Sequence, residues 1–170
     1  QEVQATTTRP AIVTVVFDDN DPSVFVAAFP LMQKYEIPGT VFVNSGTVGQ
    51  EGLVTWDALR AMDRAGWAIG NHGKFHLDLT TRSADEVVRL VREGERMLDA
   101  QGLRRASRIF NPPYNAITDR EDALIRSLIR GRDSRSPRPP NAQTRRRRKA
   151  NFYHLTQDAR SGITPMCRAL

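Results

Sequence analysis

Ala11-Ile-Val-Thr-Val-Val-Phe17 is an apolar run, rich in β-branched residues, that is followed directly by two carboxylates. Such a run is typical of a strand buried on both faces, as in parallel sheets. Working outward, helices are predicted at about 21–35, 55–66, 83–101 and 118–130, and strands at 40–43, 67–69 and 107–110. This alternation with short connections predicts βαβ units, and therefore an α/β fold with a parallel sheet or barrel.

Local signals mark the ends of these helices. Asp21 before Pro22 is typical of an N-cap with proline in the first turn. Ser83-Ala-Asp-Glu86 and Thr118-Asp-Arg-Glu121 are capping boxes, in which the first and last side chains satisfy helix N–H groups. Gly66 and Gly102 stand where helix C-caps are expected.

Charge divides the chain into two parts. Its 170 residues carry a formal net charge of +6, yet residues 1–125 hold 13 Lys and Arg against 17 Asp and Glu. Residues 126–170 hold 12 Lys and Arg against 2 Asp and Glu. The basic character therefore belongs to the C-terminal part, and nucleic acid is not the expected partner of the rest. No apolar run is long enough for a membrane span, and the single Cys167 excludes an intrachain disulfide.

We therefore divide the chain into three segments. Residues 1–10 are polar and are expected to be flexible, 11–130 form the α/β domain, and 131–170 are a basic low-complexity tail. The tail has two interpretations, a poorly ordered extension that contacts anionic polymers or nucleic acid, or a non-native, frame-shifted sequence that truncates a barrel. We favour the second because the tail lacks the patterning of the preceding domain.

Polar residues gather where the predicted strands end. They are Asp18-Asp19, Asn44-Ser45, His72 and Asn111-Pro-Pro-Tyr114. In parallel α/β folds the carboxyl ends of the strands meet at one edge, where active sites lie. These residues are therefore expected to converge.

Two histidines four residues apart suggest a metal site. On a helical turn, His72 and His76 would share one face and could bind one cation. With one carboxylate they form a ligand set that leaves positions open, which suits Zn²⁺, or alternatively Co²⁺, Ni²⁺ or Fe²⁺. A second carboxylate could then accept a proton. The alternatives are an Asx turn or N-cap at Asp18-Asp19 and a surface histidine pair in a polar loop.

The stretch Asn111-Pro-Pro-Tyr114 is the third element. Its two prolines stiffen the loop and remove two backbone N–H donors. The N–H of Tyr114 is then left as a free, well-positioned hydrogen-bond donor. The alternative is an ordinary proline turn.

Taken together, the three motifs resemble those of the polysaccharide deacetylases with the NodB homology domain, carbohydrate esterase family 4. Val16-Phe-Asp-Asp-Asn20 is similar to the family's (T)FDDG motif. The stretch Ile69-Gly-Asn-His-Gly-Lys-Phe-His-Leu-Asp-Leu-Thr80 is similar to its H-S/T-x-x-H motif with flanks, and Ile109-Phe-Asn-Pro-Pro-Tyr-Asn115 to its RPPYG motif. The resemblance covers about residues 11–130.

The resemblance implies a role for each residue of the motifs. Asp18 would be the catalytic base, and Asp19, His72 and His76 would bind the metal. The metal and the N–H of Tyr114 would stabilise the oxyanion. The substrate-binding residues would be Asn111, Pro112, Pro113 and Tyr114.

The resemblance also implies a distorted (β/α) barrel with fewer than eight strands, here incomplete. The implied reaction is metal-dependent hydrolysis of N-acetyl or O-acetyl groups from chitin oligomers, peptidoglycan or a xylan-like glycan, releasing acetate. A secreted or cell-envelope location follows, although this chain carries no signal peptide.

Several positions depart from the family pattern. Asn20 and Asn115 replace glycines, although asparagine tolerates positive φ better than most residues. Gly73 replaces Ser or Thr and removes a hydroxyl that would brace the loop. Asn111 replaces the Arg that pairs with the base, which is expected to loosen the orientation of Asp18.

The family's fourth and fifth motifs have no match. Only His154, in Phe152-Tyr-His-Leu155, is left as a general acid. We therefore expect a deacetylase of reduced activity, with two alternatives, a catalytically impaired glycan-binding domain or binding of nucleic acid or another anionic polymer through the tail.

Overall fold

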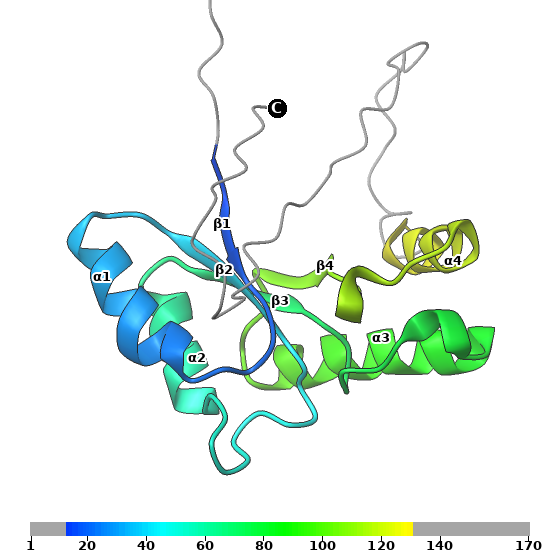
Figure 1. The fold of residues 1–170 in the computed structure, drawn as a ribbon, viewed down its shortest axis with the longest axis horizontal. Coiled ribbons are helices and arrows are strands. Elements are labelled where there is room, and N and C mark those ends of the chain that lie inside the picture. The colour runs from blue at the N-terminus through cyan, green and yellow to red at the C-terminus, as the bar shows by residue number, and fades with distance from the viewer. Residues whose placement is uncertain (1–12, 131–170) are drawn as a thin grey trace, which may run out of the picture.

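The structure is a computed structural model that describes residues 13–130. Its elements follow the predicted alternation of strand and helix (Figure 1). The strands are β1 (Val15–Phe17), β2 (Gly39–Val43), β3 (Ala68–Asn71) and β4 (Ala106–Phe110). The α-helices are α1 (Phe29–Lys34), α2 (Trp56–Arg64), α3 (Ala84–Ala100) and α4 (Asp119–Arg130), and the shorter helical turns are η1 (Val24–Ala28), η2 (Leu79–Thr81) and η3 (Pro113–Asn115).

The four strands form one parallel sheet in sequence order. Val15 pairs with Gly39 in β2, and Val43 pairs with Asn71 in β3. Between β3 and β4 the register shifts at Gly70 and Asn71, which is a local irregularity. Sequential order of parallel strands joined by helices is the arrangement of an incomplete (β/α) barrel, so the predicted fold class is confirmed. The predicted segments 1–10 and 131–170 lie outside the described residues.

The predicted caps form. The hydroxyl of Ser83 accepts from the N–H of Glu86 at 3.3 Å, and the hydroxyl of Thr118 donates to the Glu121 carboxylate. Glu121 Oε2 also accepts from the N–H of Thr118 at 3.1 Å. Helix α2 begins after Thr55, whose hydroxyl accepts from the N–H of Ala58 at 3.2 Å. These contacts start α2, α3 and α4 where the sequence predicted them.

The first helix differs from the prediction of one regular helix over 21–35. The carboxylate of Asp21 does accept from the N–H of Ser23 at 2.7 Å, but the next turn, η1, is a π-helix. Pro30 follows it in α1. A proline ring clashes with the carbonyl four residues earlier, and we attribute the wider turn to this.

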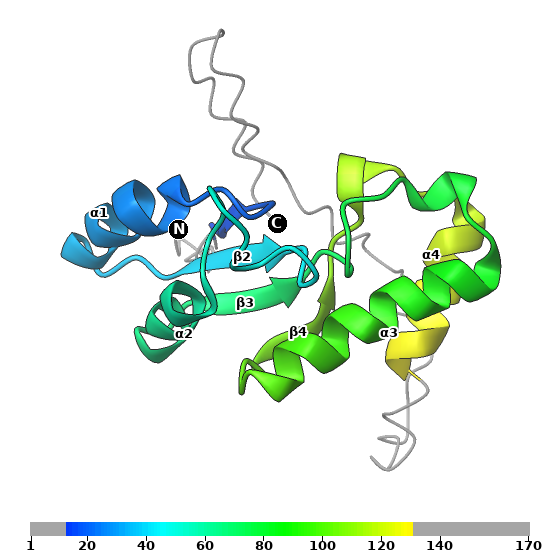
Figure 2. The same cartoon turned by 90° about the horizontal axis from the view of Figure 1, so that it is seen from below.

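Two apolar clusters hold the elements together. The larger joins the helix-facing side of the sheet to α2, and includes Val41, Leu59, Trp67 and Ile69, all at most 1% exposed. The smaller joins α3 to α4 through Val87, Leu90 and Ile125. Figure 2 shows α3 beside β4, with α4 packed against α3. Within residues 13–130, no helix has the length and apolar character that crossing a membrane requires.

Candidate metal centre

Asp19, His72 and His76 come together at the carboxyl ends of β1 and β3. Asp19 Oδ1 lies 3.4 Å from His72 Nε2 and 3.1 Å from His76 Nε2. One ligand atom from each residue lies within 4.8 Å of the others. Two ligand atoms about 2.0–2.1 Å from a tetrahedral Zn²⁺ would stand about 3.3 Å apart, so the two carboxylate–imidazole distances fit this ion.

The two histidines do not share a helical face as the spacing suggested. The segment from His72 to His76 is an irregular loop after β3, and Gly73 within it has φ +90°. The ring centroids lie 5.4 Å apart. The expectation of a helical turn is therefore wrong, and the loop brings the rings together instead.

His72 is held in the orientation that a ligand needs. Its side chain is 2% exposed, and its Nδ1 lies 2.7 Å from the carbonyl oxygen of Asn111. Because a carbonyl only accepts, Nδ1 carries a proton, and Nε2 is the ring nitrogen that faces Asp19. Histidines that bind metals usually donate their second ring N–H in this way.

His76 is half-buried beside Asp19. Burial lowers the pKa of His76 below its ordinary value, against the opposing effect of the Asp19 carboxylate. Burial thus favours the neutral imidazole, which is the form that binds a cation. The Tyr114 ring stands edge-on to it, with centroids 4.2 Å apart. This contact brings the third motif beside the cluster.

Asp18 is held by a hydrogen bond from Asn111. Asn111 Nδ2 donates to Asp18 Oδ1 at 2.9 Å, although the two residues are separated by 93 positions. Asn111 is 5% exposed, and its backbone N–H donates to the carbonyl of Asn71 at 3.1 Å. The side chain of Asn111 thus orients Asp18, where the sequence suggested that losing an arginine would leave this carboxylate loosely held.

The rest of the third motif forms a strained turn. Pro113 is buried and Pro112 half-buried, whereas the Tyr114 side chain is 65% exposed. Tyr114 and Asn115 have φ of 59° and 51°. Asn115 therefore takes the positive φ expected of the glycine it replaces. An exposed aromatic ring next to the cluster is available to a ligand.

The loop that carries Gly73 is braced without a hydroxyl. The Gly73 N–H donates to Asn71 Oδ1 at 2.8 Å, and its carbonyl accepts from the N–H of Ser45 at 3.1 Å. Its positive φ disfavours any side chain. Glycine at this position therefore supports the loop conformation.

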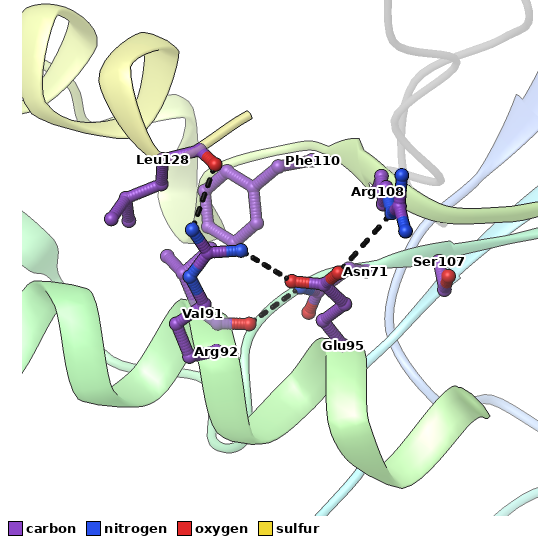
Figure 3. A pocket seen from close by; sticks show the side chains of 8 residues that line it. All are labelled: Asn71, Val91, Arg92, Glu95, Ser107, Arg108, Phe110 and Leu128. Carbon is purple, nitrogen blue, oxygen red and sulfur yellow. Dashed lines mark hydrogen bonds and ion pairs between the residues drawn. The ribbon is translucent and has the colours of Figure 1, made fainter. Parts of the chain in front are cut away.

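Helix α3 approaches this loop closely. Asn71 Nδ2 donates to the carbonyl of Val91 at 2.8 Å, and a Cβ at Gly94 would overlap Asn71 Oδ1. Figure 3 shows Asn71 beside Glu95, which pairs with Arg92 and Arg108. The cavity they line measures about 10 Å³, space for no more than one water molecule, so it is a structural gap rather than a substrate site.

Sequence reasoning named Asn44 and Asn111 at strand ends, but it missed the supporting roles of Asn20 and Asn71. Buried Asn20, Asn44, Asn71 and Asn111 stand at or just after the ends of the four strands, each at most 5% exposed. The recurrence of asparagine at every strand end was the available signal. His154, named as a general acid, lies outside the described residues.

This chain is similar to known proteins in sequence and in fold. A sequence model of the family described as polysaccharide deacetylase matches residues 5–129. Poly-beta-1,6-N-acetyl-D-glucosamine N-deacetylases of Staphylococcus aureus are 33% identical over 66 residues, which is 35% of this chain and 23% of theirs.

Solved structures share the fold. The deacetylase PplD of Streptococcus pyogenes, in complex with acetate, has a TM-score of 0.64 at 23% identity, covering 68% of this chain and 51% of its own. IcaB from Ammonifex degensii has a TM-score of 0.59 at 28% identity, covering 67% and 55%. A chitin deacetylase from Colletotrichum lindemuthianum has a TM-score of 0.59 at 22% identity, covering 71% and 54%.

The chain thus spans about half the length of these solved relatives. Because the family's sequence model covers most of the chain, from before β1 to the last turn of α4, this protein belongs to the polysaccharide deacetylase family.

Proposed function

We propose that this protein removes N-acetyl groups, or alternatively O-acetyl groups, from a polysaccharide by metal-dependent hydrolysis and releases acetate. The observation that carries the proposal is the cluster of Asp19, His72 and His76, with a second carboxylate held nearby by Asn111. A carboxylate and two imidazoles leave coordination positions open, as hydrolytic sites require.

Each residue has a definite task in this proposal. Asp19, His72 and His76 would hold the cation, with Zn²⁺ favoured and Co²⁺, Ni²⁺ or Fe²⁺ as alternatives. The cation would supply Lewis acidity toward the acetyl carbonyl and toward water. Asp18, oriented by Asn111, would take the proton from the attacking water. The N–H of Tyr114 would donate to the oxyanion of the tetrahedral intermediate.

The substrate class follows from the relatives. Among the relatives compared above, those of Staphylococcus aureus are named as deacetylases of poly-β-1,6-N-acetyl-D-glucosamine, and that of Colletotrichum lindemuthianum as a chitin deacetylase. An acetylated glycan of the cell envelope or its surroundings is the proposed substrate, and we propose the cell envelope or the extracellular space as the location of the protein. The exposed ring of Tyr114, together with the adjoining motif, would contact the sugar.

A second candidate is a glycan-binding domain that turns over slowly or not at all. Of the three histidines in the chain, His72 and His76 are both in the cation cluster. Within residues 13–130 no imidazole therefore remains to protonate the leaving amine. This observation favours impaired catalysis with retained binding.

The test is acetate release from N-acetylated chito-oligomers and poly-β-1,6-N-acetylglucosamine, with Zn²⁺ or Co²⁺ and after chelation. Wild type should release acetate only with the cation, and Asp19→Ala should release none. Asp21→Ala is the matched control, because this neighbouring carboxylate is exposed and only caps a turn. Equal release by wild type and Asp19→Ala would refute the proposal, and binding without release would favour the second candidate.

A further inference from the structure

A buried pair of asparagines joins the ends of β1 and β2. Asn20 and Asn44 are each 4% exposed. The Asn20 side chain binds the backbone of Asn44 at two points, with Nδ2 donating to the Asn44 carbonyl at 2.8 Å and Oδ1 accepting from the Asn44 N–H at 3.1 Å. Asn20 Nδ2 also donates to Thr47 Oγ1 at 2.8 Å. The side-chain amide therefore acts as a clamp between two strand ends.

The clamp continues to His72. Asn44 Nδ2 donates to the carbonyl of His72 at 2.9 Å, while the N–H of His72 donates to the carbonyl of Val43 at 3.0 Å. Both backbone groups of His72 are thus fixed to the end of β2. With Nδ1 bound to the Asn111 carbonyl, the ring has a defined direction as well.

The clamp also acts on Asp19, because Asn20 is the next residue in the chain. Asp19 has φ 64°, an unfavourable region that persists only where surrounding contacts impose it. Asn20 follows directly, and its carbonyl accepts from the N–H of Val54 at 2.8 Å. Side chain and backbone of Asn20 are therefore both held, which defines the direction of Asp19.

We propose that Asn20 and Asn44 are positioning residues that set the affinity of the cluster for its cation. This inference rests on the proposed metal site. It concerns residues that touch neither cation nor substrate and act through Asp19 and His72. Glycine, which stands at position 20 in the resembling motif, has no side chain to make these contacts.

The expected effect is large enough to measure. Outer contacts of metal ligands typically change metal affinity by 10- to 100-fold when they are removed. Asn20→Gly and Asn44→Ala should each weaken Zn²⁺ binding by about that factor. Thr47→Val removes a single acceptor of the clamp and should have a smaller effect in the same direction.

The experiment titrates the full chain with Zn²⁺ by calorimetry and records thermal unfolding of the metal-free forms. Ser107→Ala is the matched control, because this buried hydroxyl donates to Asp99 in α3 at 2.7 Å and contacts no ligand residue. It should lower thermal stability and leave the Zn²⁺ dissociation constant unchanged. If the asparagine variants do not fold, the Zn²⁺ affinity of Thr47→Val still tests the inference.

Three results are distinguishable. Weaker binding by the clamp variants, with Ser107→Ala like wild type, supports the inference. Wild-type affinity in folded clamp variants overturns it and leaves the metal site intact. Absence of Zn²⁺ binding by wild type overturns the metal site and the inference together.

Discussion

Replacing Asn111 by alanine separates two contacts of one residue. The substitution removes the amide that donates to Asp18 Oδ1 at 2.9 Å, but keeps the backbone carbonyl that binds His72 Nδ1. A hydrogen bond to a charged group contributes about 1.5–3 kcal/mol, and each 1.4 kcal/mol is about a factor of ten in rate. If the bond orients the base in the transition state, kcat should fall by about 10- to 150-fold.

The assay is steady-state acetate release by the Zn²⁺-loaded protein, with Zn²⁺ affinity measured in parallel. Zn²⁺ affinity should not change, because the carbonyl of residue 111 still holds His72. KM should stay near the wild-type value, since the side chain is buried against Asp18. Unchanged kcat with a raised KM would refute a positioning role and favour the substrate-binding role predicted from the sequence.

Three further predictions concern stability. Gly73→Ser should lower the free energy of unfolding by about 1–2 kcal/mol in urea titrations, because a side chain at φ +90° is strained. A stabilised variant would contradict this and show that a hydroxyl braces the loop. Gly94→Ala should lower the free energy of unfolding by about 1–3 kcal/mol in the same assay, since its Cβ would overlap Asn71. An unchanged midpoint of the urea titration would mean that α3 can move away from Asn71 without loss of stability. The Thr118 hydroxyl holds the pKa of Glu121 below its ordinary value of 4.5, so that contact stabilises the fold above this pH and is lost as pH falls through the lowered pKa. The deficit in melting temperature of Thr118→Val should therefore be largest near neutral pH and shrink below about pH 4.5, and a deficit independent of pH would contradict this.

Local chemistry made much of the fold predictable. The β-branched run before Asp18 forms a parallel strand, and the capping boxes at Ser83 and Thr118 start α3 and α4 as expected. The expectation that this strand is buried on both faces is wrong, because β1 lies at the edge of the sheet, only Val16 in it is buried, and Val13 is exposed. The carboxyl ends of parallel strands meet by geometry, so the convergence of Asp19 with His72 could be anticipated. These inferences depend on neighbours in sequence or on a rule of topology.

Contacts between distant residues were not predictable in the same way. The bond from Asn111 to Asp18 joins residues 93 positions apart, and the Asn20–Asn44 clamp joins residues 24 apart. Each is decided by the packed strands rather than by local sequence. A sequence pattern shows that Asn20 differs from glycine, but only the fold shows what its amide binds.

The loop between His72 and His76 has a similar explanation. A spacing of four residues fits a helix, yet Gly73 takes φ +90° and ends that possibility. Hydrogen bonds of the Gly73 backbone with the N–H of Ser45 and with Asn71 Oδ1 then set the loop. The spacing therefore pointed to two histidines whose rings do lie close together, but through the wrong local structure.

X-ray absorption at the zinc edge of the Zn²⁺-loaded chain tests the central claim most directly. The account predicts two imidazole nitrogens and oxygen ligands at about 2.0–2.1 Å, and one imidazole in His76→Ala. A spectrum with sulfur from Cys167, or with the same imidazole count in wild type and His76→Ala, would contradict a cation held by Asp19, His72 and His76.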